Sequence, residues 1–116
     1  MQMLTMRNIM NQNGDQAKLI WMTEYGAPTQ GPGTKATTTD YKFNSAPDNV
    51  DEALQALMAT QAVQLRLSYT WAGPLFWYGY KDLGTNPADN ENFFGLVRAD
   101  GSRKPAYDAF VKAVRP

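Results

Sequence analysis

The sequence predicts an α/β fold in which a helix joins two parallel strands. Two segments have the length and composition of buried strands, residues 18–24 and 75–80. Between them, the segment from Val50 to Arg66 carries apolar residues at helical spacing. Because a helical crossover returns the chain to the same end of a sheet, the two strands should run in the same direction.

Residues 2–12 are expected to form the first helix. Its apolar residues recur at helical spacing and Asn13-Gly14 ends the pattern. The stripe consists of Met3, Met6, Ile9 and Met10. We interpret it as the buried face of the helix rather than as a ligand site.

Residues 18–24 predict a strand that is buried on both faces. Leu19 to Met22 is an unbroken apolar run, and Gly26 and Pro28 stop it. Its C-terminal end carries Glu24, at the end of parallel strands where α/β enzymes place their chemistry. Glu24 is therefore the first functional candidate. The alternative is that Glu24 is simply a solvent-exposed carboxylate at the end of a strand.

A polar segment, residues 29–49, follows this strand and contains too few apolar residues for a packed element. Long loops in compact domains are often lids or binding loops. Because the segment leaves the strand end that carries Glu24, we expect it to lie over whatever Glu24 faces. A plain surface loop is the alternative.

The next helix should run from about residue 50 to Arg66. Asp48 or Asn49 is expected to cap it, with Asp51 and Glu52 in its first turn. Its expected apolar face consists of Val50, Ala53, Leu54, Leu57, Met58, Ala62 and Leu65.

Residues 69–82 hold six of the fourteen aromatic residues. The second strand, 75–80, is entered through Gly73-Pro74 and ends before Asp82. A period of two separates two sets of residues, one able to line a cavity and the other to pack under a helix. The sets are Phe76, Tyr78 and Tyr80, and Leu75, Trp77 and Gly79.

The remaining residues predict a polar turn region, a short apolar return and a last helix. Residues 83–92 are polar and 93–97 are mostly apolar. Lys104-Pro105 opens the helix with proline at its first position. The expected buried stripe is Tyr107, Phe110, Val111 and Val114.

Composition narrows the chemistry. The length of 116 residues fits one domain, and eleven basic residues balance eleven acidic ones, which favours neither nucleic acid nor a membrane as a partner. Without cysteine or histidine, disulfides, thiolate metal sites, the usual zinc sites and a Ser-His-Asp triad are excluded, and we predict no metal site. Acid–base chemistry must rest on carboxylates, tyrosines or lysines.

Two parallel strands cannot cover their own edges. We therefore expect this chain to be a piece of something larger, which needs a partner fragment or associates with itself.

Three blocks of the sequence resemble clan A glycoside hydrolases, which include families five and thirty-nine. Trp21 to Gly26 resembles their seventh strand and Phe76 to Asp82 their eighth. Phe94 to Tyr107 is similar to the segment that leads into their last helix. The resemblance implies that residues 1–116 are the C-terminal portion of a (β/α)8 TIM barrel, from the sixth to the eighth helix.

The same resemblance implies retaining hydrolysis of oligo- or polysaccharides without a cofactor. Glu24 matches the catalytic nucleophile, and Tyr78 stands near the position of an aromatic sugar platform, with Trp77 as the competing candidate. Tyr25, or a tyrosine of the last strand such as Tyr80, would donate hydrogen bonds to the nucleophile.

The acid/base of these enzymes lies in an Asn-Glu pair after the fourth strand, which this chain lacks. Asn90-Glu91 has the same letters but follows a polar loop, so we interpret it as unrelated. A catalytically inactive carbohydrate-binding or self-assembling remnant is the first alternative, and an unrelated α/β interaction module is the second. The first residues carry no signal-peptide pattern, and secretion would require one further upstream.

Overall fold

The computed structural model describes residues 2–40 and 46–115. Its elements in chain order are α1 (Gln2–Gln12), β1 (Ile20–Tyr25), β2 (Lys35–Ala36), β3 (Asn49–Val50), α2 (Glu52–Ser68), β4 (Ala72–Trp77), the 3₁₀ helix η1 (Asn90–Phe93) and α3 (Pro105–Val114).

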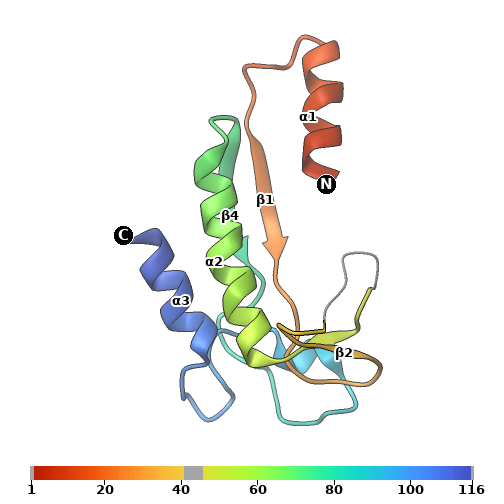
Figure 1. The fold of residues 1–116 in the computed structure, drawn as a ribbon, viewed down its shortest axis with the longest axis vertical. Helices are drawn as coiled ribbons and strands as arrows, with labels where there is room; N and C mark the ends of the chain where they lie inside the picture. The colour runs from red at the N-terminus through yellow and green to blue at the C-terminus, as the bar shows by residue number, and fades with distance from the viewer. Residues whose placement is uncertain (1, 41–45, 116) are drawn as a thin grey trace.

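The central feature is the parallel pair of β1 and β4, joined by α2 as the crossover (Figure 1). The register places Ile20 opposite Ala72, Met22 opposite Leu75 and Tyr25 opposite Trp77. The predicted α/β fold with two parallel strands is therefore confirmed. Parallel pairing also brings the loops that follow both strands to one end of the molecule, the lower end in Figure 1.

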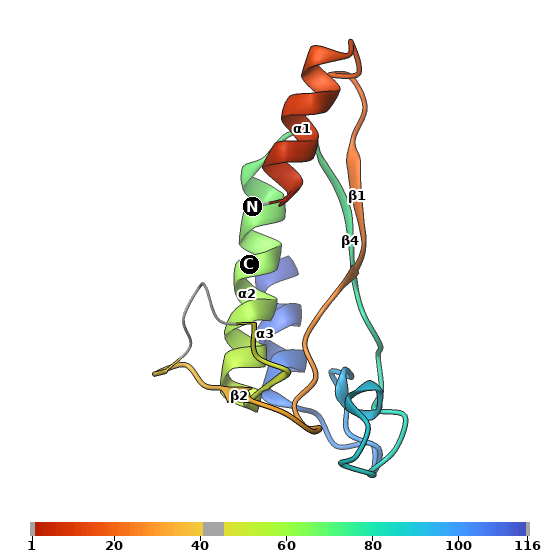
Figure 2. The ribbon, with the colours of Figure 1, turned by 90° about the vertical axis from the view of Figure 1, so that its right-hand side faces the viewer.

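The helices α2 and α3 lie on one side of the strand pair, and no element of the described residues covers the other side (Figure 2). The core is accordingly one-sided. One buried cluster joins α2 to α3 and the segment before it, through Ala59, Leu96 and Ala106. A second cluster joins α2 to the loop after β1, through Ala27, Ala36, Val50 and Leu54.

Strand β1 begins two residues later than predicted, and its burial on both faces is wrong. Leu19 is 52% exposed and Trp21 is 61% exposed. The apolar run has the composition of a central strand, but here its only ladder partner among the described residues is β4. Trp21 instead lies against Phe76, which is also exposed, with ring centroids 6.4 Å apart.

Strand β4 spans Ala72–Trp77, three residues before the predicted segment. Gly73 and Pro74, interpreted as a turn, lie inside it. A Cβ at Gly73 would come within 2.8 Å of the Trp21 side chain, so this position needs glycine for the close approach of β1. Pro74 is tolerated because β4 is an edge strand.

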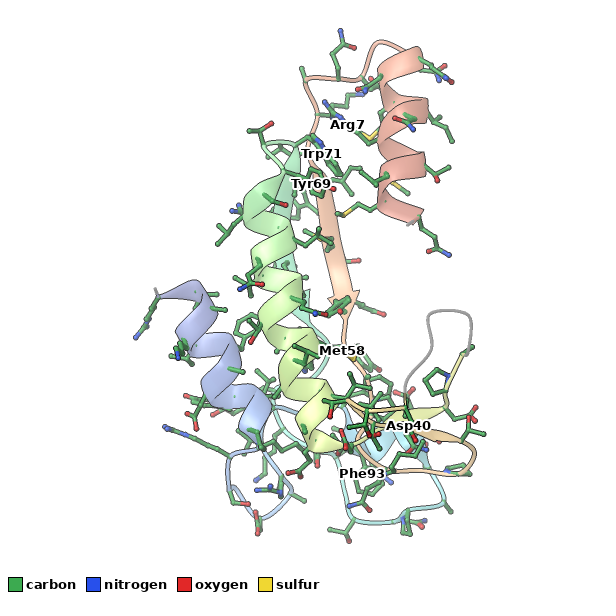
Figure 3. The ribbon with its side chains drawn as sticks, in the orientation of Figure 1. Arg7, Asp40, Met58, Tyr69, Trp71 and Phe93 are labelled. Carbon is green, nitrogen blue, oxygen red and sulfur yellow. The ribbon has the colours of Figure 1, made fainter. Side chains whose placement is uncertain are left out.

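Helix α1 matches its predicted bounds, but its methionine stripe is not buried. None of the described residues of α1 is buried, and Met6 and Ile9 are more than half exposed. Arg7 holds the helix, since its guanidinium donates to the Lys18 carbonyl at 3.0 Å and lies over the Trp71 ring. Tyr69 stacks on the same ring, and Figure 3 shows the three side chains together.

Helix α2 is capped by Asp51, and not by Asp48 or Asn49 as predicted. The Asp51 carboxylate accepts a 2.7 Å hydrogen bond from the Leu54 amide, while Asn49 belongs to β3. Gln55, a polar residue, is fully buried; its side-chain amide donates to the Ala27 carbonyl at 3.0 Å, while its side-chain oxygen has no hydrogen-bond partner among the described residues.

Helix α3 begins at Pro105 as predicted. Its predicted stripe is only partly covered, because Val111 and Val114 are 36% and 47% exposed; the fully buried residue of the helix is Ala106, outside that stripe. No helix in the described ranges has the length and apolarity needed to cross a membrane.

The polar segment 29–49 is not structureless. Lys35 and Ala36 pair in parallel with Asn49 and Val50, and the Asp48 carboxylate accepts from the Thr34 amide at 2.7 Å. Residues 41–45 of the predicted loop lie outside the described residues.

Candidate functional site

The site is built where β1 and β4 end. After the last register pair, the Tyr78 amide donates to the Tyr25 carbonyl at 2.8 Å, so the ladder continues one step past β4. This hydrogen bond fixes the residue after β4 beside the last residues of β1. Glu24 and Tyr78 are thereby held at the same end of the sheet.

Glu24 and Tyr78 line one hollow of about 310 Å³. Its volume falls at the lower end of the ~300–1,000 Å³ typical of small-molecule sites. The lining residues come from the ends of both strands and from the segment at η1. They are Glu24, Tyr25, Gly26, Tyr78, Glu91 and Phe94.

Glu24 is exposed and, within the described part of the chain, its carboxylate has no hydrogen-bond or ion-pair partner. The predicted donation from Tyr25 or a tyrosine of the last strand to Glu24 is not seen among the described residues; the Tyr78 hydroxyl donates to Glu91 instead. An unengaged carboxylate at the edge of a hollow is free to meet a ligand.

Tyr78 donates its hydroxyl to the Glu91 carboxylate at 2.8 Å. That hydrogen bond, reinforced by the negative charges of Glu91 and, more weakly, Glu24, raises the pKa of Tyr78 above its ordinary value. The Tyr78 ring stands edge-on to Phe94, with centroids 4.9 Å apart. The ring is thus fixed at its hydroxyl and at one edge, and it remains 36% exposed.

Tyr25 is half-buried, and burial raises the pKa of its hydroxyl. Its ring lies edge-on to Trp77 at 5.9 Å. Tyr25 therefore lines the hollow and also packs against Trp77.

Trp77, the competing platform candidate, does not line the hollow. Its indole nitrogen donates to the Phe94 carbonyl at 3.0 Å, and its ring packs edge-on against Phe110 of α3. The structure therefore places Trp77 between sheet and helix, as the alternation along the strand predicts for its face.

Tyr80 is also outside the hollow. It is 67% exposed and lies near Tyr107, with centroids 6.5 Å apart. The backbone turns at Gly79, which has a φ of +84°, so the alternation expected for a continued strand ends before Tyr80.

Glu91 also lines the hollow, a position that its sequence pattern does not predict. It lies in η1, where its amide donates to the Asp89 side chain at 3.0 Å. The Asn90 amide group donates to the Asp48 carbonyl at 2.7 Å, and Phe93 is buried (Figure 3). The short helix is thus tied on both sides of Glu91.

For the described residues of the polar segment 29–49, the prediction that they lie over Glu24 is wrong. None of its described residues lines the hollow; the segment at η1 does so instead. The described part of the loop is held elsewhere, through β2, β3 and the ties to Asp48.

A buried ion pair ties together the loop segments on either side of Phe94, which lines the hollow. The Lys104 ammonium donates to the Asp82 carboxylate at 2.8 Å, and to Thr29 Oγ1 and the Phe93 carbonyl at 3.0 Å each. Burial lowers the pKa of Lys104, while the hydrogen bond and charge of Asp82 oppose that shift. Asp82 also accepts from the Gly95 amide at 2.8 Å. Three loop segments therefore meet on one lysine.

A larger hollow of about 440 Å³ lies at the start of α2. Its charged groups are already engaged, because Asp51 caps the helix, Glu52 pairs with Arg98, and Lys35 donates to the Thr29 carbonyl. Among the described residues, no group of three or more acidic side chains could hold a metal ion.

Known structures of glycoside hydrolases share this fold. A family 39 glycoside hydrolase from the gut symbiont Bacteroides cellulosilyticus WH2 is 28% identical, with a TM-score of 0.59 over 84% of this chain. A GH5_18 protein from Streptomyces cattleya, in complex with GlcNAc, is 24% identical, with a TM-score of 0.58 over 84% of this chain. A β-glucuronidase from Faecalibacterium prausnitzii is 18% identical, with a TM-score of 0.59 over 97%.

No family model and no curated protein sequence matches the chain. The aligned region represents only 16%, 20% and 18% of the three solved chains, respectively. The α/β arrangement described above thus matches a part of the TIM barrel found in glycoside hydrolases.

Proposed function

We propose that the chain is the C-terminal portion of a retaining glycoside hydrolase, residues 1–116 spanning the sixth to the eighth helix of its barrel. The observation that carries the proposal is the position of Glu24, at the C-terminal end of β1 and in one hollow with Tyr78. In barrels of this kind, catalytic side chains project from the same ends of the strands.

Glu24 is the nucleophile in this proposal. Its carboxylate attacks the anomeric carbon and forms a glycosyl ester, while a second carboxylic acid, ~5 Å away, protonates the departing oxygen. Water then attacks the ester, and the second group takes up the water's proton. That acid/base comes from residues outside this chain, and the reaction requires no cofactor.

Tyr78 supplies the aromatic wall. Its ring is partly exposed and is fixed by Glu91 and Phe94, so an apolar sugar face can stack on it without first ordering the side chain. The substrate is an oligo- or polysaccharide.

The missing part of the barrel completes the site. The strand pair is bare on one side, and Trp21 and Phe76 are exposed. An N-terminal barrel portion that covers these residues would also deliver the acid/base. In its absence, a second copy of this chain is the expected partner.

The decisive experiment compares Glu24→Gln with the unchanged chain. Both are expressed with the N-terminal barrel portion of the family 39 neighbour, and hydrolysis of 4-nitrophenyl β-glycosides is measured. Loss of the nucleophile should lower kcat by about 10⁴-fold or more. Activity that survives Glu24→Gln would refute the role of Glu24.

A carbohydrate-binding remnant without hydrolysis is the second candidate. It is favoured by the small share of the barrel present and by the preformed Tyr78 wall. This second candidate predicts that the isolated chain binds glycosides. It also predicts that no glycoside is hydrolysed, even when the N-terminal barrel portion is present. Binding that persists in Glu24→Gln without any hydrolysis by the unchanged chain would identify it.

A further inference from the structure

The charge of the hollow points to a preference among sugars. Two carboxylates, Glu24 and Glu91, line it, and no lysine or arginine does. Lys81 lines an adjoining hollow of about 160 Å³, which shares Tyr78, Glu91 and Phe94 with this one. A third negative group, brought into this space by a ligand, would therefore meet repulsion from both glutamates.

The contacts of Glu91 fix its position and leave part of its carboxylate available to a ligand. One of its oxygens accepts from Tyr78, and no cation pairs with it within the described residues. A carboxylate offers about four acceptor positions, so further hydrogen bonds from ligand hydroxyls are available. Its backbone is tied through Asp89, which keeps this group at the rim of the hollow.

We propose that Glu91 is a specificity-determining residue that favours neutral glycosides over those of uronic acids. The inference rests on the proposed function, because it assigns the sugar class to the hollow that holds Glu24. Glu91 accepts hydrogen bonds from hydroxyl groups of the sugar stacked on Tyr78. A uronic acid would present a carboxylate to Glu24 and Glu91 instead.

The test uses a pair of ligands that differ only at the sixth carbon, 4-nitrophenyl β-D-glucoside and 4-nitrophenyl β-D-glucuronide. Dissociation constants come from chemical-shift changes of the Tyr78 amide in the 116-residue chain. The xyloside and the N-acetylglucosaminide serve as further neutral probes. The unchanged chain should bind the glucoside more tightly than the glucuronide.

Glu91→Gln keeps an acceptor for the Tyr78 hydroxyl but removes the charge. The ratio of the two dissociation constants should then shift toward the glucuronide by about three- to tenfold. Asp108→Asn is the matched control, since Asp108 lies exposed on α3 and does not line the hollow; it should leave the ratio unchanged. Raising NaCl to ~1 M should narrow the preference of the unchanged chain.

The outcomes separate the two proposals. A glucuronide that binds as tightly as the glucoside overturns the preference. An unchanged ratio in Glu91→Gln overturns the role of Glu91 but leaves the glycosidase proposal standing. If none of the four glycosides binds the unchanged chain, the inference is overturned; the proposed function is decided separately, by the loss of hydrolysis in Glu24→Gln beside the N-terminal portion.

Discussion

The hydroxyl of Tyr78 reports directly on the charge of its neighbour. Glu91→Gln removes the negative charge that raises the Tyr78 pKa, so that pKa should fall toward its ordinary value. Titration of ¹³C-labelled tyrosine followed by NMR measures the change, and Tyr78→Phe assigns the signal. A Tyr78 pKa unaffected by Glu91→Gln would contradict the hydrogen bond.

The raised pKa of Tyr78 also determines the direction in which stability changes with pH. A raised pKa means that folding favours the protonated phenol. The stabilising contact with Glu91 is therefore fully present below the ordinary tyrosine pKa. It is lost as pH rises through the folded value.

Lys104 is the residue whose loss should harm stability most. Lys104→Met leaves the Asp82 charge buried without its partner, which typically costs about 3–5 kcal/mol. Urea unfolding followed by circular dichroism gives the value. Lys112→Met, at an exposed position of α3, is the control and should change little.

The double variant Lys104→Met/Asp82→Leu tests the cause. If the unpaired charge is responsible, removing Asp82 as well should recover part of the loss. A double variant no more stable than Lys104→Met would point to lost packing instead.

Single residues divide into those that local pattern could predict and those that it could not. Glu24 and Tyr78 follow from strand ends and alternation, and the structure brings them into one hollow. Glu91 and Lys104 act through contacts 13 and 22 residues away in the chain, with Tyr78 and Asp82. No sequence periodicity encodes such contacts, so both were missed.

Among the helices and strands, the N-cap of α2 offers the most direct test by mutation. Asp51→Ala removes the acceptor for the Leu54 amide and should lower the free energy of unfolding by about 0.5–2 kcal/mol. Asp51→Ser retains a capping oxygen and is the matched control. Equal losses in the two variants, measured by urea unfolding, would argue against a capping role.

Helices were easier to predict than strands. Periodicity over ten or more residues placed both ends of α1 and α2 within about two residues of those observed, and Lys104-Pro105 placed the start of α3. Strand β4 begins three residues before the predicted segment, because Gly73-Pro74 has the composition of a turn. In the structure, the close approach of the Trp21 side chain requires glycine at position 73. That requirement comes from the neighbouring strand and is invisible in the local sequence.

The whole molecule should associate in solution. Sedimentation is expected to show a concentration-dependent oligomer, because the bare side of the strand pair exposes Trp21 and Phe76. Trp21→Ser with Phe76→Ser should shift the equilibrium toward monomer. Leu83→Ser, at a 78% exposed loop position, is the control. A compact monomer at all concentrations would contradict this prediction.

Burial was the global property that the sequence predicted least well. The stripes of α1 and the run of β1 have the apolarity of residues inside a larger barrel. Here they remain exposed, since the described part of the chain provides only one layer of helices. The fold class could be predicted from the sequence, because it depends on the order of helices and strands. Even a part of a barrel retains that order.

The pairing of Ile20 with Ala72 also has a kinetic consequence. A parallel ladder cannot begin at a tight hairpin, so its first contacts must close a loop of about fifty residues before any ladder energy is gained. Refolding is thus expected to be slow, with unpaired strand backbone exposed until the ladder forms.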